Sequence, residues 1–121
     1  MIYAKILGSP IAHGIIRRID ASKARAHPGV LAVITGANVP DTWYGVSPAR
    51  YDEQILAKDR VRYVEDEIAA VAAVDEQTAE RALRLIEVEF DELPAVFDPE
   101  AAMASGAPVI LALSLACCAE R

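Results

Sequence analysis

The chain has few of the residues that mark specialised classes of protein. It contains only two cysteines, Cys117 and Cys118, which are adjacent in the sequence. Neighbouring cysteines rarely reach disulfide geometry, and two thiols cannot complete a tetrahedral zinc site. We therefore expect a reducing, cytoplasmic environment. The six glycines are scattered along the chain, so no glycine-rich phosphate loop is predicted.

Surplus positive charge and long apolar runs are also missing. The net charge is −6, whereas a surface that binds phosphate backbones needs clustered lysine and arginine. The first residues include Lys5 and lack the apolar core of a signal peptide. The apolar segment from Leu111 to Ala119 is far shorter than the roughly 20 residues that cross a bilayer. We expect neither a nucleic-acid partner nor a membrane partner.

What is present indicates a single globular domain. The chain has 121 residues, of which 54% are hydrophobic and 25% charged. Its first half predicts three strands, and Asp20 or Ser22 is placed to cap a short helix between the second and the third. The strands are expected at Tyr3–Leu7, Ile15–Asp20 and Val30–Ile34. The region from Gly36 to Arg50, which contains Trp43, predicts a long irregular loop that is disordered in an isolated domain.

The second half gives clearer periodicity. Val61–Tyr63 predicts a half-exposed strand, and the apolar run Ile68–Val74 predicts a central strand covered on both faces. Asp75 stands at the N-cap of an amphipathic helix, and Asp98 precedes a proline that suits the first position of a last short helix. The helix between these points has an apolar stripe of Ala79, Ala82, Leu83 and Ile86, with Glu80 and Arg84 four residues apart on another face.

After this helix the period changes from 3.6 to two. Ile86, Val88 and Phe90 are expected to point inward, and Glu87, Glu89 and Asp91 outward, as in a strand. The resulting order is β-β-α-β-loop-β-β-α-β-α, without the regular βαβ alternation of a doubly wound sheet. We therefore expect an α+β fold, a mixed sheet with packed helices. Its core should centre on Ile68–Val74, against the helix stripe.

Two acidic clusters are candidates for carboxylate chemistry. The first is Glu65-Asp66-Glu67, which falls in a turn, and the second is Glu89-Asp91-Glu92. Paired carboxylates act as acid and base only when they face each other across a cleft. Glu87, Glu89 and Asp91 instead share one exposed strand face, so a solvated acidic surface is the favoured interpretation.

The histidines offer no better candidate. His13 and His27 are not at metal-ligand spacing, so structural or solvent-exposed roles are expected for both. A Ser-His-Asp set could be assembled from Ser9, His13 and Asp20, but no nucleophile elbow accompanies it. The sequence therefore predicts no catalytic, cofactor-binding or metal-binding residue.

Several segments together resemble the hammerhead domain of the xanthine dehydrogenase and aldehyde oxidase family. One is a Ser-Pro-x-Ala-His segment at Ser9 to His13, and another is Val-Ile-Thr-Gly at Val33 to Gly36. Between them lie an aspartate, a short helix and Pro-Gly-Val, here ending at Val30. Val-Arg-Tyr-Val follows at Val61 to Val64. Within the family, the loop from Tyr44 to Gln54 looks closest to 4-hydroxybenzoyl-CoA reductase alpha-type subunits.

Three features depart from the family pattern. The family normally has arginine at the position of Gly8 and glycine at the position of Glu65. Because glycine tolerates a positive φ, a glutamate there implies a strained turn or a changed one. The third departure is the tail, LALSLACCAER, which suggests a frameshifted or truncated reading frame. We assign residues 1–110 to the hammerhead domain and residues 111–121 to an atypical apolar tail.

The resemblance implies a non-catalytic scaffold, a fragment of the large subunit of a molybdopterin-dependent hydroxylase or dehydrogenase. The glycine-rich cofactor loops, the glutamine near the pterin and the glutamate base of such enzymes would lie outside this chain. Implied partners are the remainder of the molybdenum subunit and FAD and iron–sulfur subunits, with possible self-association. The chain alone is expected to be inactive and to hold no cofactor. The alternative is a free-standing protein-interaction module that binds through the Trp43 loop or an open sheet edge.

Overall fold

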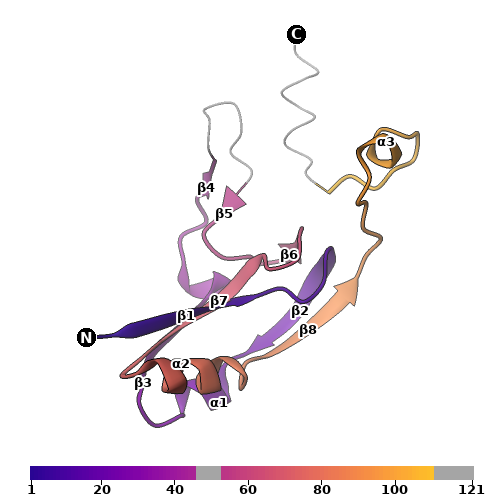
Figure 1. The fold of residues 1–121 in the computed structure, drawn as a ribbon. Coiled ribbons are helices and arrows are strands. Elements are labelled where there is room, and N and C mark those ends of the chain that lie inside the picture. The colour runs from indigo at the N-terminus through magenta and orange to yellow at the C-terminus, as the bar shows by residue number, and fades with distance from the viewer. Residues whose placement is uncertain (46–52, 111–121) are drawn as a thin grey trace.

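The computed structural model describes residues 1–45 and 53–110 (Figure 1). In chain order the elements are β1 (Tyr3–Gly8), β2 (Gly14–Asp20), α1 (Ser22–Arg25), β3 (Val30–Thr35), the 3-10 turn η1 (Gly36–Asn38), β4 (Trp43–Tyr44), β5 (Glu53–Gln54), β6 (Arg60–Val61), β7 (Glu67–Ala73), α2 (Glu76–Leu83), β8 (Glu87–Glu92) and α3 (Pro99–Ala102). The expected order of the main strands and helices is confirmed, and η1, β4 and β5 are additional short elements.

The first sheet has the order β1-β7-β3, with β7 antiparallel to both neighbours. Val71 in the middle of β7 is paired with Lys5 on one side and Val33 on the other. Helices α1 and α2 lie against one side of this sheet (Figure 1). The main core forms there, and its buried members are Ala21, Ala24, Val33, Ala69, Val71, Ala82 and Ile86. The predicted packing of the central strand against the helix stripe is confirmed.

The second sheet has the order β6-β2-β8, also antiparallel. Its strand β8 shows the predicted alternation, because Val88 and Phe90 are half-buried between exposed acidic residues. They pack on a smaller core of Ala57, Val61 and Ile68. The α+β class is therefore confirmed, with the strands divided among small sheets that include the β4–β5 pair.

The starts of α2 and α3 follow the predicted capping, whereas that of α1 does not. The Asp75 carboxylate accepts the Thr78 amide at 2.8 Å, and the Asp98 carboxylate accepts the Ala101 amide at 2.8 Å. At α1 the N-cap position is Ala21, yet the Asp20 carboxylate accepts the amide of Ser22 at 3.0 Å. Asp20 thus satisfies a first-turn amide from one residue before the cap, as its side-chain oxygens allow.

Two local predictions are wrong. The strand expected at Val61–Tyr63 ends at Val61, because Arg62 and Tyr63 enter a turn that Asp66 closes. The region expected to be an irregular loop contains β4, which pairs with β5. Residues 46–50, the last part of that region, lie outside the described residues, so the disorder expected there stays a prediction.

The prediction that Ile68–Val74 is covered on both faces is also wrong in part. Ala69, Val71 and Ala73 are buried on the helix side, but Ala70 and Ala72 on the other side are only half-buried. Val74 lies beyond the strand and is half exposed. One face of the first sheet is therefore open over part of its length.

Candidate functional site

The acidic cluster on β8 is a solvated strand face. Glu87, Glu89 and Asp91 are all exposed. Lys23 forms an ion pair with Glu87, and Arg17 forms one with Asp91. The Arg17 guanidinium gains a hydrogen bond and a charge partner from Asp91, which raise the pKa of Arg17. Exposed pairs of this kind contribute little to stability.

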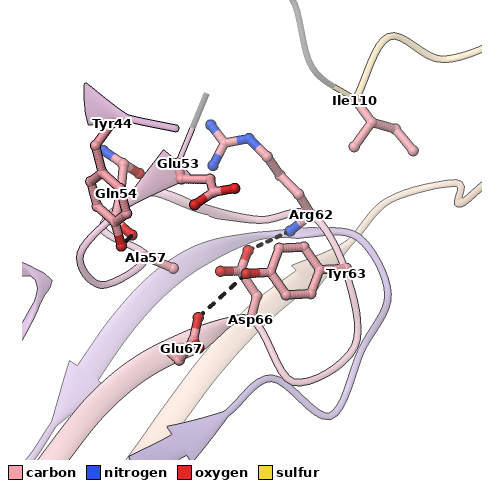
Figure 2. A pocket seen from close by; sticks show the side chains of 9 residues that line it. All are labelled: Tyr44, Glu53, Gln54, Ala57, Arg62, Tyr63, Asp66, Glu67 and Ile110. Atoms are coloured by element: carbon pink, nitrogen blue, oxygen red, sulfur yellow. Dashed lines mark hydrogen bonds between the residues drawn. The ribbon is translucent and has the colours of Figure 1, made fainter. Parts of the chain in front are cut away.

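The other acidic cluster borders a pocket of about 490 Å3 (Figure 2). The pocket lies between the β4–β5 hairpin and the turn that joins β6 to β7. Its lining residues are Tyr44, Glu53, Gln54, Ala57, Arg62, Tyr63, Asp66, Glu67 and Ile110. Of these, sequence reasoning singled out only Asp66 and Glu67. The remainder come together through the pairing of two-residue strands, for which the sequence carries no periodic signal.

Asp66 is the most constrained acid of the pocket. It is only 8% exposed, and its carboxylate accepts the backbone amide of Arg62 at 2.9 Å. Burial raises the pKa of Asp66, against the opposing effect of that hydrogen bond. The expectation of a fully solvated cluster is therefore wrong for Asp66, whose side chain closes the turn between β6 and β7. Glu65 and Glu67 beside it are exposed, as expected.

Tyr63 and Glu67 form the outer wall of the same turn. The Tyr63 hydroxyl donates to the Glu67 carboxylate at 3.3 Å (Figure 2). Burial, with the charges of Asp66 and Glu67, raises the pKa of Tyr63 to about 12. The phenol therefore keeps its proton at neutral pH and cannot act as a base there.

Arg62 supplies a positive charge to the lining of the pocket and lies close to the β4–β5 hairpin. Its guanidinium carbon lies 5.4 Å from the ring centroid of Trp43, within cation–π range. This contact joins the β6–β7 turn to β4, the element that sequence analysis expected to be a loop. Trp43 itself is partly exposed at the edge of the hairpin.

The residues that line the pocket hold the β6–β7 turn and the β4–β5 hairpin together. The Asp66 carboxylate accepts a backbone amide and the Glu67 carboxylate accepts a phenol, so both side chains hold the turn between β6 and β7. Within residues 1–45 and 53–110, no group of three histidine, cysteine or acidic side chains is placed to hold a metal ion. The contacts support a structural role for these residues.

The remaining candidates are used structurally as well. His13 is 4% exposed, and its Nδ1 lies 2.8 Å from the carbonyl oxygen of Pro94, so it fastens β2 to the segment after β8. His27 contacts the carbonyl of Pro28 at 2.9 Å. Ser9 is fully buried and donates to the carbonyl of Ile11 at 2.8 Å. The Asp20 carboxylate accepts the amide of Ser22, so the Ser9, His13 and Asp20 set rejected above has separate partners.

None of the helices in the described part of the chain is long and apolar enough to span a membrane. Cys117 and Cys118 lie outside the described residues.

Comparison with known sequences finds relatives that include a molybdenum-binding subunit. The chain is 44% identical over 112 residues to a probable hypoxanthine oxidase, XdhD, of Escherichia coli O157:H7, covering 88% of this chain and 12% of that protein. It is 40% identical over 119 residues to the xanthine dehydrogenase molybdenum-binding subunit of the same organism, covering 91% of this chain and 16% of that subunit. This chain thus spans only a small part of the length of these relatives.

A solved structure agrees in fold. The aldehyde oxidoreductase of Desulfovibrio gigas matches with a TM-score of 0.82 and 31% identity, over 92% of this chain and 13% of that one. The family model described as "Aldehyde oxidase and xanthine dehydrogenase, a/b hammerhead domain" matches residues 1–94. The chain therefore belongs to the aldehyde oxidase and xanthine dehydrogenase family, of which it contains the a/b hammerhead domain.

Proposed function

We propose that this chain serves as a non-catalytic scaffold domain in the large subunit of a molybdenum-dependent oxidoreductase of the xanthine dehydrogenase type. The observation that carries the proposal is the engagement of its polar residues. Asp66, Tyr63, Ser9 and His13 all hold backbone or turn geometry in a domain whose family match extends over residues 1–94. A domain built this way supplies shape and surface, and the chemistry belongs to other parts of the subunit.

The pocket does not suit the cofactor that the family implies. Molybdopterin carries a phosphate, and anionic groups are bound by clustered cations and free backbone amides. The pocket instead presents Glu53, Asp66 and Glu67 against the single guanidinium of Arg62. Like charges would repel the phosphate there. We therefore assign the cofactor to the remainder of the parent subunit and no step of the reaction to this chain.

The partners of the domain follow from the same proposal. Its nearest neighbour is the remainder of the molybdenum subunit, of which the relatives contain several times the length of this chain. FAD and iron–sulfur subunits complete the assembly. The name of one relative, "molybdenum-binding subunit", supports a multi-subunit parent.

Replacement of the domain in a relative tests the proposal. The full chain, flanked by flexible linkers, replaces the matching region of the molybdenum-binding subunit of Escherichia coli O157:H7. We expect a soluble subunit that contains molybdenum. A control subunit in which the linkers alone replace the matching region should contain no molybdenum. The purified chain by itself should contain no molybdenum by elemental analysis and turn over no aromatic or purine substrate. Stoichiometric molybdenum in the isolated chain, or an insoluble replaced subunit, would contradict the proposal.

A further inference from the structure

The pocket beside the β6–β7 turn is negatively charged. The carboxylates of Glu53, Asp66 and Glu67 line it, and among the described lining residues only Arg62 carries a positive charge. The Arg62 guanidinium lies over the ring of Trp43, at the side of the hairpin. The lining therefore has a surplus of negative charge, and the property that repels a phosphate attracts a cation.

Asp66 directs one carboxylate oxygen into this pocket. The residue is 8% exposed, and its Oδ2 accepts the Arg62 amide at 2.9 Å. The Tyr63 hydroxyl lies near Asp66 as well, but its single proton is donated to Glu67. No described residue donates a hydrogen bond to Oδ1 of Asp66, which points toward the β4–β5 hairpin (Figure 2). A carboxylate oxygen with so little access to water gains strongly from a charged donor.

The three carboxylates act on the same region of the pocket. Burial first, and then the charges of Asp66, Glu67 and Glu53, raise the pKa of Tyr63 to about 12. All three charges therefore lie within electrostatic reach of one hydroxyl group, although Glu53 belongs to β5 and Glu67 to β7. The fold thus brings carboxylates from two separate segments together around one cavity.

The size and the walls of the pocket favour an organic cation over a metal ion. Its volume of about 490 Å3 is within the range of about 300–1,000 Å3 that holds small molecules. As noted above, no group of three side chains in the described residues is placed to hold a metal ion. Tyr44 and Tyr63 lie on opposite sides of the pocket (Figure 2), and Ala57 and Ile110 add apolar surface. Aromatic rings attract cations and also stack on other rings.

We propose that this pocket binds a small aromatic amine, a primary ammonium group on a short aromatic body. The ammonium group lies between Oδ1 of Asp66 and the carboxylate of Glu53, and its three N–H donors serve both. The aromatic body lies between the rings of Tyr44 and Tyr63. Binding involves no chemical step, and the site is additional to the scaffold role.

Three probes of similar shape test the charge of the occupant. 2-Phenylethylamine is the cation, 2-phenylethanol is its neutral counterpart and phenylacetate is the anion, and each is titrated into the full chain at neutral pH by calorimetry. We expect 2-phenylethylamine to bind with a dissociation constant of about 1 mM or below, as a ligand of this size permits. The other two should bind at least about tenfold more weakly. Equal binding of the amine and the alcohol, or no binding of the amine, would overturn the proposal.

Two variants test the location of the site. Asp66→Asn keeps an acceptor for the Arg62 amide and removes the charge, and Glu53→Gln removes the charge of an exposed side chain. Each should weaken the binding of 2-phenylethylamine by about three- to tenfold. The matched control Glu89→Gln makes the same change in net charge on β8, outside the pocket, and should stay within about twofold of the unchanged chain. If circular dichroism shows that Asp66→Asn does not fold, Glu53→Gln alone decides. A folded pocket variant that binds the amine as the unchanged chain does would overturn the proposal.

N-acetyl-lysine methylamide distinguishes a free aromatic amine from the lysine side chain of a protein. It carries the same ammonium group but no ring to lie between Tyr44 and Tyr63, so we expect it to bind at least about tenfold more weakly than 2-phenylethylamine. Equal or tighter binding would assign the pocket to a lysine side chain and overturn the proposal. None of these titrations involves the parent subunit, so failure of the amine site leaves the proposed scaffold function to its own test.

Discussion

Gly8 and Glu65 are in direct contact, so a side chain at position 8 would collide with Glu65. A Cβ added to Gly8 would lie 2.5 Å from Oε2 of Glu65 and 2.8 Å from its Cα. Glu65 has a φ of 68°, the sole positive value for a residue other than glycine in the described residues. Its amide donates to the carbonyl of Ser9 at 2.8 Å. The two positions that depart from the family pattern therefore meet, and the turn is strained.

Replacement of Glu65 by glycine should stabilise the chain. The left-handed conformation costs a residue with a Cβ about 1–2 kcal/mol, and the entropy of glycine offsets roughly 0.5–1 kcal/mol of the gain. We expect Glu65→Gly to raise the free energy of unfolding by about 0.5–1 kcal/mol in urea titration. The control Glu89→Gly, in an exposed strand position, should lower it by a similar amount. A loss of stability in Glu65→Gly would show that the strain is absent.

Gly8→Ala tests the same contact from the other side. The added methyl group must displace the Glu65 side chain and press against its backbone, so we expect a loss of about 1–3 kcal/mol, as for other overpacked sites. In the Glu65→Gly background the loss should be smaller but still present, because the contact with the Cα at position 65 remains. Equal losses in both backgrounds, measured by the same titration, would mean that the two positions are not coupled.

The core predicts a graded response to truncation. Ile68 is fully buried in the smaller cluster, whereas Leu83 is only half-buried at the rim of the main core. We expect Ile68→Ala to cost about 2–5 kcal/mol and Leu83→Ala to cost less, near the lower end of that range. The exposed Ile55→Ala should change stability by less than about 0.5 kcal/mol. A larger loss for Leu83 than for Ile68, in chemical unfolding, would contradict this assignment of the core.

Asp66 and Asp75 should give opposite pH dependences. The folded state raises the pKa of Asp66 through burial, so its contribution to stability is present below the unfolded pKa and is lost as the pH rises through the folded one. The folded state lowers the pKa of Asp75 through hydrogen bonds from Thr78, so its contribution is present above the unfolded pKa and is lost as the pH falls through the folded one.

Asparagine at each position separates the two effects. Asp66→Asn keeps an oxygen for the Arg62 amide and removes the buried charge, so its advantage over the unchanged chain should grow as the pH rises from acid to neutral. Asp75→Asn should be less stable than the unchanged chain at neutral pH, and the difference should vanish in acid. Thermal unfolding followed from about pH 2 to pH 7 gives both curves, and the same sign of change for the two variants would contradict the assignment.

Trp43 offers an optical probe of the hairpin. Because Trp43 is the chain's single tryptophan and Arg62 lies over its ring, Arg62→Gln should expose the indole. We expect its emission to move to longer wavelength and its quenching by acrylamide to increase. The control Arg81→Gln, on the exposed side of α2, should leave both unchanged. Identical spectra for the two variants would mean that Arg62 does not cover the ring in solution.

The sequence predicts those parts of the fold that local rules govern. The caps at Asp75 and Asp98 and the alternation of β8 follow from hydrogen-bonding chemistry and periodicity within a few residues. The β4–β5 pair depends on contacts across the intervening chain, and strands of two residues leave no periodicity to detect. The burial of Asp66 could not be predicted either. It comes from the hairpin and the turn that meet around this side chain, and these are contacts between separate segments of the chain.

Self-association of the isolated chain is the remaining prediction, and its source is the tail. Leu111, Leu113 and Leu115 alternate in sequence, as in a strand that pairs with another chain; these residues lie outside the described part of the structure. Both edge strands of the first sheet, β1 and β3, are available for such pairing within that part. We expect sedimentation at micromolar concentration to show dimers or larger species, and deletion of residues 111–121 to shift them toward monomer. A full chain that is monomeric, and remains so after the deletion, would refute the prediction.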